Sequence, residues 1–331
     1  MPNFNGCCFL GIDTGATKTH ALLTNAAGKV LAFEQGGPGN PQSIGGYQSL
    51  KRMVTELVQR ACQSAGVASK QIHAAGLGLA GYDWTSQYER FYQVIRSAGL
   101  PENSFLANDA ALGIYAGTSQ GWGICVGAGT SFNCRGIGRD GREARAIGDG
   151  LKWGEGAGAL ELAVRAAQMV IAQWLRTGPE TRLTDLFMET FDAESLAELV
   201  EGMVLRRYPV TAKLAPCIFD VARAGDEPAN EAVRWAAGKL ADLAIGAARQ
   251  LDLQEQPFEI VLSGSFFKAG KILIDPMKEK ILLVAKHAEF RLLDIQPVCG
   301  AVIMAMIKSG SVEVERFEEI KNQFRDYFDR L

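Results

Sequence analysis

The apolar residues in the first part of the chain alternate between continuous runs and helical spacing. Residues 7–12 form an unbroken apolar run, which is typical of a buried strand. Residues 20–34 predict two strands joined by a turn at Asn25–Gly28. In residues 46–66 the apolar positions predict an amphipathic helix that ends at Gly66. Further elements are predicted in the same way: a strand at 73–81, a helix at 86–100, and a strand, turn and helix at 104–117.

A similar pattern begins again near residue 121. The segments 11–32 (GIDTGATKTHALLTNAAGKVLA) and 123–144 (GICVGAGTSFNCRGIGRDGREA) both start with Gly-Ile-x-x-Gly-Ala. Each then runs through a second predicted strand to a turn glycine, Gly28 in the first segment and Gly141 in the second. Two related halves predict a duplicated domain, and a cleft between the two copies is the expected place for a site.

The second half has more helical spacing than the first. Residues 156–178, 195–209 and 210–253 predict helices, and residues 258–270 predict a buried strand that enters a Gly/Ser turn. Residues 312–331 carry a stripe of apolar side chains, so we expect a helix packed on the body of the protein. The stripe consists of Val314, Phe317, Ile320, Phe324, Phe328 and Leu331.

Composition narrows the class of protein. The chain has 331 residues, 47% of them hydrophobic, which suits two domains with buried cores. The formal net charge is −3 and no basic block occurs, which argues against nucleic acid or an anionic membrane as partner. We find no signal-peptide pattern and no transmembrane run, and the seven cysteines form no CxxC pair. We therefore expect a cytoplasmic protein with reduced thiols.

The stretch FLGIDTGATKTH, residues 9–20, places polar chemistry directly behind the first predicted strand. Free backbone N–H groups of a glycine-rich turn, together with hydroxyls and a lysine, can bind phosphate oxygens. Asp13 is placed to hold a magnesium ion. A polar hairpin with an incidental acid is the alternative. The candidate nucleotide and metal contacts in this stretch are Asp13, Thr14, Gly15, Thr17, Lys18 and Thr19.

The second copy of this turn has glycines and hydroxyls but neither acid nor lysine. It suits a second phosphate clamp, although a simple tight turn would have the same composition. Its candidate contacts are Gly127, Gly129, Thr130 and Ser131. In IVLSGS, Gly264 and Ser265 could lie against the base and ribose of a nucleotide, and a plain strand-to-helix turn stays open as the alternative.

Asp109 lies in LANDAALG, between a short apolar run and an alanine-rich helix. An aspartate there could cap the helix N-terminus. A carboxylate at the end of a strand in a cleft could instead accept the proton of a substrate hydroxyl during phosphoryl transfer.

These motifs occur in an order that resembles the actin-like ATPase superfamily of sugar kinases and heat-shock chaperones. The closest likeness is to the BadF/BadG/BcrA/BcrD ATPase family, in its N-acetylglucosamine kinase and glucosamine kinase branch, over residues 8 to 310. The motifs that carry it are GIDTGATKT, GPGN, GLGLAG, NDAALG, GAGTSFNCR, GDGLKWGEGAGA and IVLSGS. The resemblance implies an α/β fold with two RNase H-like domains around a cleft, residues 1–119 with 310–331 and residues 120–309. It also implies ATP and Mg²⁺ as cofactors, a small sugar as substrate and a homodimer.

The resemblance assigns roles to individual residues. Asp13 would bind magnesium, Asp109 would be the general base, and Gly264 would belong to the adenosine motif. The residues that match sugar contacts of the amino sugar kinases are Asn40, Gly81 and Asn133. Glu155 stands where the family has an aspartate at the sugar, and its longer side chain shifts the carboxylate by about one methylene. The GAGTSFN segment is also one residue longer than the family's usual form.

The leading prediction is therefore an ATP-dependent kinase acting on the 6-hydroxyl of N-acetylglucosamine or glucosamine. One alternative is an activator ATPase for a radical dehydratase or reductase, which needs cysteines around an iron–sulfur cluster. Cys125 and Cys134 are the only candidates in the middle of the chain. The other alternative is a non-catalytic sugar-binding protein of the same fold.

Overall fold

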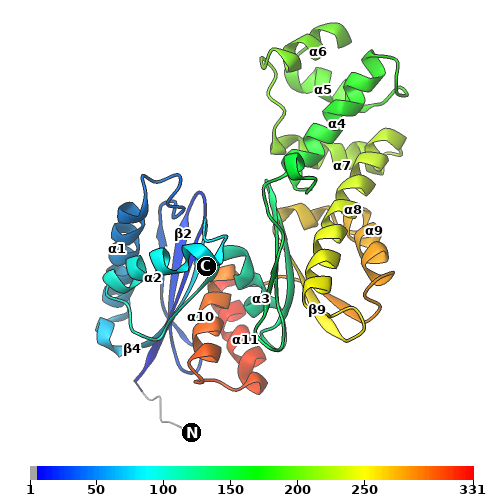
Figure 1. Ribbon diagram of the computed structural model, residues 1–331. Helices are drawn as coiled ribbons and strands as arrows, with labels where there is room; N and C mark the ends of the chain where they lie inside the picture. The colour runs from blue at the N-terminus through cyan, green and yellow to red at the C-terminus, as the bar shows by residue number, and fades with distance from the viewer. Residues whose placement is uncertain (1–5) are drawn as a thin grey trace.

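The computed structural model describes residues 6–331, and in this part of the chain the strands form two five-stranded sheets flanked by helices (Figure 1). The first sheet has the order β3-β2-β1-β4-β5. Its central strand β1 pairs antiparallel with β2 and parallel with β4. The strands are β1 (Cys8–Thr14), β2 (Thr19–Asn25), β3 (Val30–Gly36), β4 (Ile72–Leu79) and β5 (Ser104–Asn108).

The second sheet repeats this arrangement, with the order β10-β9-β6-β7-β8. Its strand β6 pairs antiparallel with β7 and parallel with β9, as β1 does with β2 and β4. Gly28 and Gly141 both have positive φ, 83° and 80°, at corresponding hairpin turns. The predicted internal repeat is thus confirmed. The strands are β6 (Gly123–Ala128), β7 (Phe132–Ile137), β8 (Glu143–Arg145), β9 (Phe258–Ser263) and β10 (Ala288–Leu292).

Helices cover both faces of the first sheet because its central strand is apolar on both sides. Leu10 and Ile12 of β1 belong to a core with helices α1 and α2, while Phe9 belongs to a core with α10 and α11. The predicted helix stop at Gly66 is confirmed, since this residue ends α1 in the left-handed conformation. The helices are α1 (Tyr47–Ala65), α2 (Tyr88–Ser97), α3 (Leu112–Gly117), α10 (Pro297–Lys308) and α11 (Phe317–Phe328).

Helix α10 lies unusually close to the first sheet. A Cβ on Gly11 would come within 2.6 Å of the Val298 carbonyl, and one on Gly76 within 2.0 Å of the Ala301 carbonyl. Glycine at these two strand positions therefore makes room for the helix backbone. Because α10 packs on β1 and β4, we propose that the first structural unit takes up the chain again at residue 297 rather than at 310.

The last helix packs on the body of the protein, as its apolar stripe predicted. Phe317, Ile320 and Phe324 are buried, whereas Val314 and Leu331 at the two ends of the stripe are exposed. The docked part of the stripe is therefore its middle.

The second half carries an extended helical region beyond its sheet, with α4 to α6 at the far end (Figure 1). The alanine-rich helix α8 packs against the sheet and against α4, α7 and α9. Asp226 caps α8, its Oδ1 accepting a hydrogen bond of 2.9 Å from Ala229 N, and so separates α8 from α7. The helices are α4 (Ala159–Trp174), α5 (Leu183–Phe191), α6 (Leu196–Val204), α7 (Ala215–Arg223), α8 (Glu227–Gln250) and α9 (Lys271–Leu282).

Short 3₁₀ turns connect several of these elements. Three of them bear on the site: η3 follows β5, η5 precedes α7, and η6 follows β9. The turns are η1 (Ser69–Gln71), η2 (Thr85–Gln87), η3 (Asp109–Ala111), η4 (Leu151–Trp153), η5 (Ala212–Leu214), η6 (Ser265–Ala269) and η7 (Val314–Arg316). Among the described residues, no helix combines the length and the apolar character needed to span a membrane.

Candidate active site

Two partly buried carboxyl groups lie at one edge of the first sheet. Asp13 is near the end of β1 and Asp109 directly follows β5, and parallel pairing through β4 brings these strand ends to the same edge. Burial raises the pKa of Asp13 to about 7, with a further contribution from the charge of Asp109, while Lys18 opposes the shift. Burial also raises the pKa of Asp109 to about 6. The structure thus brings the predicted metal ligand and the predicted base into electrostatic contact.

Asn108 performs the capping role that the sequence left open for Asp109. Its Oδ1 accepts a hydrogen bond of 3.1 Å from Ala110 N at the start of η3. Asp109 Oδ1 also accepts from Ala110 N, at 3.0 Å. Asn108 caps η3, and Asp109 contributes only its Oδ1 to the same N–H group. The other carboxylate oxygen of Asp109 is therefore not used in stabilising the turn.

The first glycine-rich turn is held by backbone hydrogen bonds. Gly15 N donates to Lys18 O at 2.9 Å, and Gly39 N donates to Gly15 O at 2.9 Å. A cavity of about 430 Å³ opens beside this turn and extends to the start of α10 at Gln296 and Pro297. Four predicted contacts line it: Asp13, Gly15, Thr17 and Lys18.

Thr14 and Thr19 of the same turn are fully buried and do not line this cavity. They lie opposite one another in the β1–β2 hairpin, one position along from the Asp13–His20 pair, so they occupy the other face of the sheet. Thr14 Oγ1 accepts a hydrogen bond of 2.9 Å from Ala80 N, which ties β1 to the end of β4. We therefore leave both threonines out of the proposed phosphate contacts.

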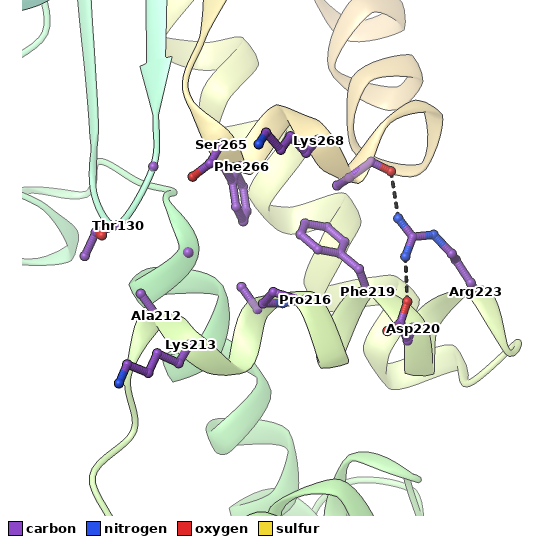
Figure 2. A pocket seen from close by; sticks show the side chains of 14 residues that line it. Thr130, Ala212, Lys213, Pro216, Phe219, Asp220, Arg223, Ser265, Phe266 and Lys268 are labelled. Carbon is purple, nitrogen blue, oxygen red and sulfur yellow. Dashed lines mark hydrogen bonds and ion pairs between the residues drawn. The ribbon is translucent and has the colours of Figure 1, made fainter. Parts of the chain in front are cut away.

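A second, larger cavity of about 480 Å³ lies in the second half, between η6 and α7 (Figure 2). The rings of Phe219 and Phe266, with centroids 5.3 Å apart, make its apolar wall. Arg223 closes one end by donating to Asp220 Oδ1 at 2.7 Å and to Ala269 O at 2.8 Å. Its volume and apolar walls suit a nucleotide base and ribose.

Three of the predicted nucleotide contacts line this cavity, namely Gly129, Thr130 and Ser265. Gly127, Ser131 and Gly264 do not line it. Gly264 has φ +109°, and a Cβ there would lie 2.2 Å from the Ala128 carbonyl oxygen, so it fixes the turn beside the cavity. The wall formed by η5 and α7 was not predicted, because it lies far along the chain from these motifs and carries no motif of its own.

The predicted sugar contacts form two groups. Asn40 and Gly81 are neighbours, since a Cβ on Gly81 would lie 2.7 Å from Asn40 Oδ1. In the other group, Asn133 Nδ2 donates to Asn108 Oδ1 at 3.4 Å, beside Asp109. Both groups thus border the sheet edge that carries the carboxyls of Asp13 and Asp109.

Glu155 organises the loop next to Asn133. Its two carboxylate oxygens accept hydrogen bonds of 2.7 Å from Ile147 N and 2.6 Å from Gly148 N. A Cβ on Gly148 would lie 3.8 Å from Asn133 Oδ1, so this loop borders the second group of predicted contacts. The longer side chain at position 155 therefore holds the loop backbone.

Cys125 and Cys134 are both fully buried, on opposite faces of the second sheet. Cys125 packs with Ile114 and Val261, while Cys134 belongs to the large core on the other side. Among the residues that the structure describes, no three His, Cys, Asp or Glu side chains gather as a metal-binding group. This placement does not support the cluster that an activator ATPase needs.

The duplicated sheets and the carboxyl groups at the sheet edge define a two-domain α/β protein of the actin-like kind. Two solved structures match this fold over almost their full lengths. A protein from Chromobacterium violaceum described as a candidate N-acetylglucosamine kinase matches with a TM-score of 0.62 and 22% identity, over 90% of this chain and 99% of that one. The ROK hexokinase from Thermus thermophilus matches with a TM-score of 0.55 and 19% identity, over 92% and 100%.

The chain belongs to the BadF/BadG/BcrA/BcrD ATPase family, whose model matches residues 10–305. Two relatives cover most of its length. The N-acetylmuramic acid/N-acetylglucosamine kinase of Clostridium acetobutylicum is 25% identical over 300 residues, covering 89% of this chain and 97% of the relative. The N-acetyl-D-glucosamine kinase of Dictyostelium discoideum is 26% identical over 316 residues, covering 90% and 97%.

Proposed function

We propose that this protein transfers the γ-phosphate of ATP to the 6-hydroxyl of an amino sugar, N-acetylglucosamine or glucosamine, with Asp109 as the general base. The observation that carries this proposal is the partly buried carboxyl of Asp109, which lies beside Asp13 and has its pKa raised to about 6. Such a group is mainly ionised at neutral pH, yet it is a stronger base than an exposed aspartate. It can therefore take the proton of a sugar hydroxyl as the phosphoryl group arrives.

In this proposal each of the two cavities binds a different part of ATP. The apolar walls at Phe219 and Phe266 suit the adenine base, and Thr130 offers a hydroxyl to a phosphate oxygen. Thr17 and Lys18 offer a hydroxyl and a positive charge from the other cavity, beside Gly15. In this arrangement the transferred phosphate lies between the two glycine-rich turns.

Asp13 fits the magnesium ion that usually accompanies ATP. Its partly buried carboxyl lines the cavity beside the first glycine-rich turn, and carboxylate oxygen is the ligand type that Mg²⁺ prefers. When bound, the ion would neutralise phosphate charge that builds up during transfer. Lys18 would supply the second positive charge from the same turn.

The choice of an amino sugar rests on the relatives, both of which are named as kinases of N-acetylglucosamine. Asn40, Gly81 and Asn133 are the proposed sugar contacts. Glu155, which holds the loop beside Asn133, would shape the pocket through that loop. We also propose a homodimer, which sedimentation velocity at micromolar concentration would test.

The experiment compares the wild type with Asp109→Asn, measuring ADP release with a panel of amino sugars and neutral sugars. We expect amino sugars to stimulate ADP release by the wild type, and the substitution to lower kcat by about 10²–10⁴-fold. Asp140→Asn, at an exposed aspartate on the β7–β8 turn, is the matched control. Unchanged turnover in Asp109→Asn would show that the base is assigned wrongly. A wild type that no sugar stimulates would point to the non-catalytic alternative.

A further inference from the structure

Arg135 is a buried arginine that connects the two halves of the molecule. It comes from β7 in the second sheet, and its side chain is only 8% exposed. Its Nη2 donates to Asp83 Oδ1 at 3.0 Å, and its Nε donates to Asn108 Oδ1 at 3.2 Å. Both acceptors belong to the first half, in the loop after β4 and at the end of β5.

Asn108 is the residue through which this contact reaches the proposed base. Its Nδ2 donates to Tyr82 O at 3.1 Å and to Asp83 Oδ1 at 3.0 Å. Its Oδ1 accepts from Ala110 N as well as from Arg135. The side chain thus fixes the backbone on both sides of Asp109, which is the next residue in the chain.

A second arginine supports the same loop. Arg145 of β8 donates from Nη1 to the Asp83 carbonyl at 2.8 Å, and its guanidinium lies 4.3 Å from the centroid of the Trp84 ring. Arg145 therefore holds the loop backbone, whereas Arg135 is the arginine that reaches both the Asp83 carboxylate and Asn108.

We propose that Arg135 is a positioning residue for phosphoryl transfer, holding Asn108 and Asp83 so that the Asp109 carboxyl stays aligned with the acceptor hydroxyl. The inference rests on the proposed function and deepens it. The two contacts need a planar guanidinium that donates from two nitrogens in fixed directions. A lysine at this position keeps the charge but cannot reproduce both contacts.

The test compares Arg135→Lys with the wild type in steady-state kinetics. A displacement of about 1 Å at the base costs about 10²-fold in rate, so we expect kcat to fall by about that factor. The KM for ATP should change less than about twofold, because Arg135 touches neither nucleotide cavity. Arg142→Lys is the control, since this exposed arginine of the same hairpin pairs only with Asp140 and Asp252 among the described residues.

Chemical rescue separates positioning from a general loss of structure. Arg135→Ala leaves a gap of guanidinium shape, and we expect millimolar guanidinium chloride to restore part of kcat there but not in Asp109→Asn. A double-mutant cycle with Asp83→Asn should show non-additive effects on kcat and on the melting temperature, because the two side chains are in direct contact.

The inference is overturned if Arg135→Lys keeps kcat within about threefold of the wild type. It is also overturned if kcat, the KM for ATP and the melting temperature all change together without rescue, which would mark a structural role. If the wild type phosphorylates no sugar, the proposed function fails and the positioning role fails with it. The non-additive effects of the Arg135 and Asp83 substitutions on the melting temperature would then remain, as a property of the fold alone.

Discussion

Replacing Gly264 by alanine tests the connection between backbone geometry and nucleotide binding. Gly264 has φ 109° and ψ 163°, a conformation reserved almost entirely for glycine. A Cβ there would lie 2.2 Å from the Ala128 carbonyl oxygen and 2.8 Å from its carbon. Both are backbone atoms at the end of β6, so no side-chain rotation can relieve the contact.

The cost has two parts. The backbone conformation costs an alanine about 1–3 kcal/mol, and forcing the Cβ against Ala128 adds about 1–3 kcal/mol. Gly270→Ala is the matched control, since Gly270 ends the same short turn with φ 72° and ψ −144° but a Cβ there would meet nothing within 4 Å. Gly270→Ala should therefore incur the cost of the backbone conformation without the cost of a Cβ collision.

The assay is calorimetric titration with ADP together with thermal unfolding. The collision would displace Ser265 relative to Gly129 and Thr130, and all three residues line the cavity proposed for the nucleotide. A loss of about 1–3 kcal/mol in binding corresponds to a Kd raised about 5–150-fold in Gly264→Ala. We expect Gly270→Ala to bind ADP within about threefold of the wild type. Equal ADP affinity and equal melting temperature in the two variants would refute this reasoning.

Three further predictions concern stability and binding. The folded-state pKa of Asp109, about 6, lies above the ordinary value of 3.8, so folding favours the protonated carboxyl. The stability that Asp109 contributes is therefore present below pH 4 and is lost as the pH rises through 6. Asp109→Asn should thus be more stable than the wild type by about 1–3 kcal/mol at pH 7.5 but not at pH 4. Thermal melts at both pH values test this, and an equal difference in stability at the two would contradict it. Glu259→Ala should lower the free energy of unfolding by about 1–3 kcal/mol in urea titrations, because Glu259 Oε2 accepts from Ser119 N at 2.6 Å and from its hydroxyl at 2.9 Å. The exposed Glu289→Ala is its control, and equal losses would show that the contact with Ser119 contributes nothing. Thr130→Val should raise the KM for ATP about tenfold with an unchanged melting temperature. An unchanged KM would remove Thr130 from the proposed phosphate contacts.

The elements that the sequence predicted are those whose signal is local. The apolar run at 7–12 became the central strand β1, and the helical spacing up to Gly66 became α1. The repeat between 11–32 and 123–144 predicted a duplicated domain, because each copy contains a complete hairpin with its turn glycine, and the two sheets have the same topology. Strand alternation also explains why Asp13 lines a cavity while its neighbour Thr14 is buried.

What the sequence did not predict depends on contacts between distant segments. Helix α10 packs on the first sheet because Gly11 of β1 and Gly76 of β4 leave room for its backbone. Nothing in the sequence around these two glycines indicates that a helix will pack on them. In the sequence α7 has the pattern of an ordinary amphipathic helix, and it forms a wall of the larger cavity only because η6 packs opposite it. Arg135 and Asp83 are separated by 52 residues and meet only when β7 of the second sheet lies against the loop after β4.

The central claim is phosphoryl transfer from ATP to an amino sugar, and the most direct measurement is to identify the product. The protein is incubated with ATP, Mg²⁺ and N-acetylglucosamine or glucosamine, and the mixture is examined by proton-coupled ³¹P NMR and mass spectrometry. Our account predicts a sugar monophosphate formed in equal amount to ADP, with the triplet of a phosphate on a CH₂ group. ADP accompanied only by inorganic phosphate, or no ADP with any amino sugar, would contradict it.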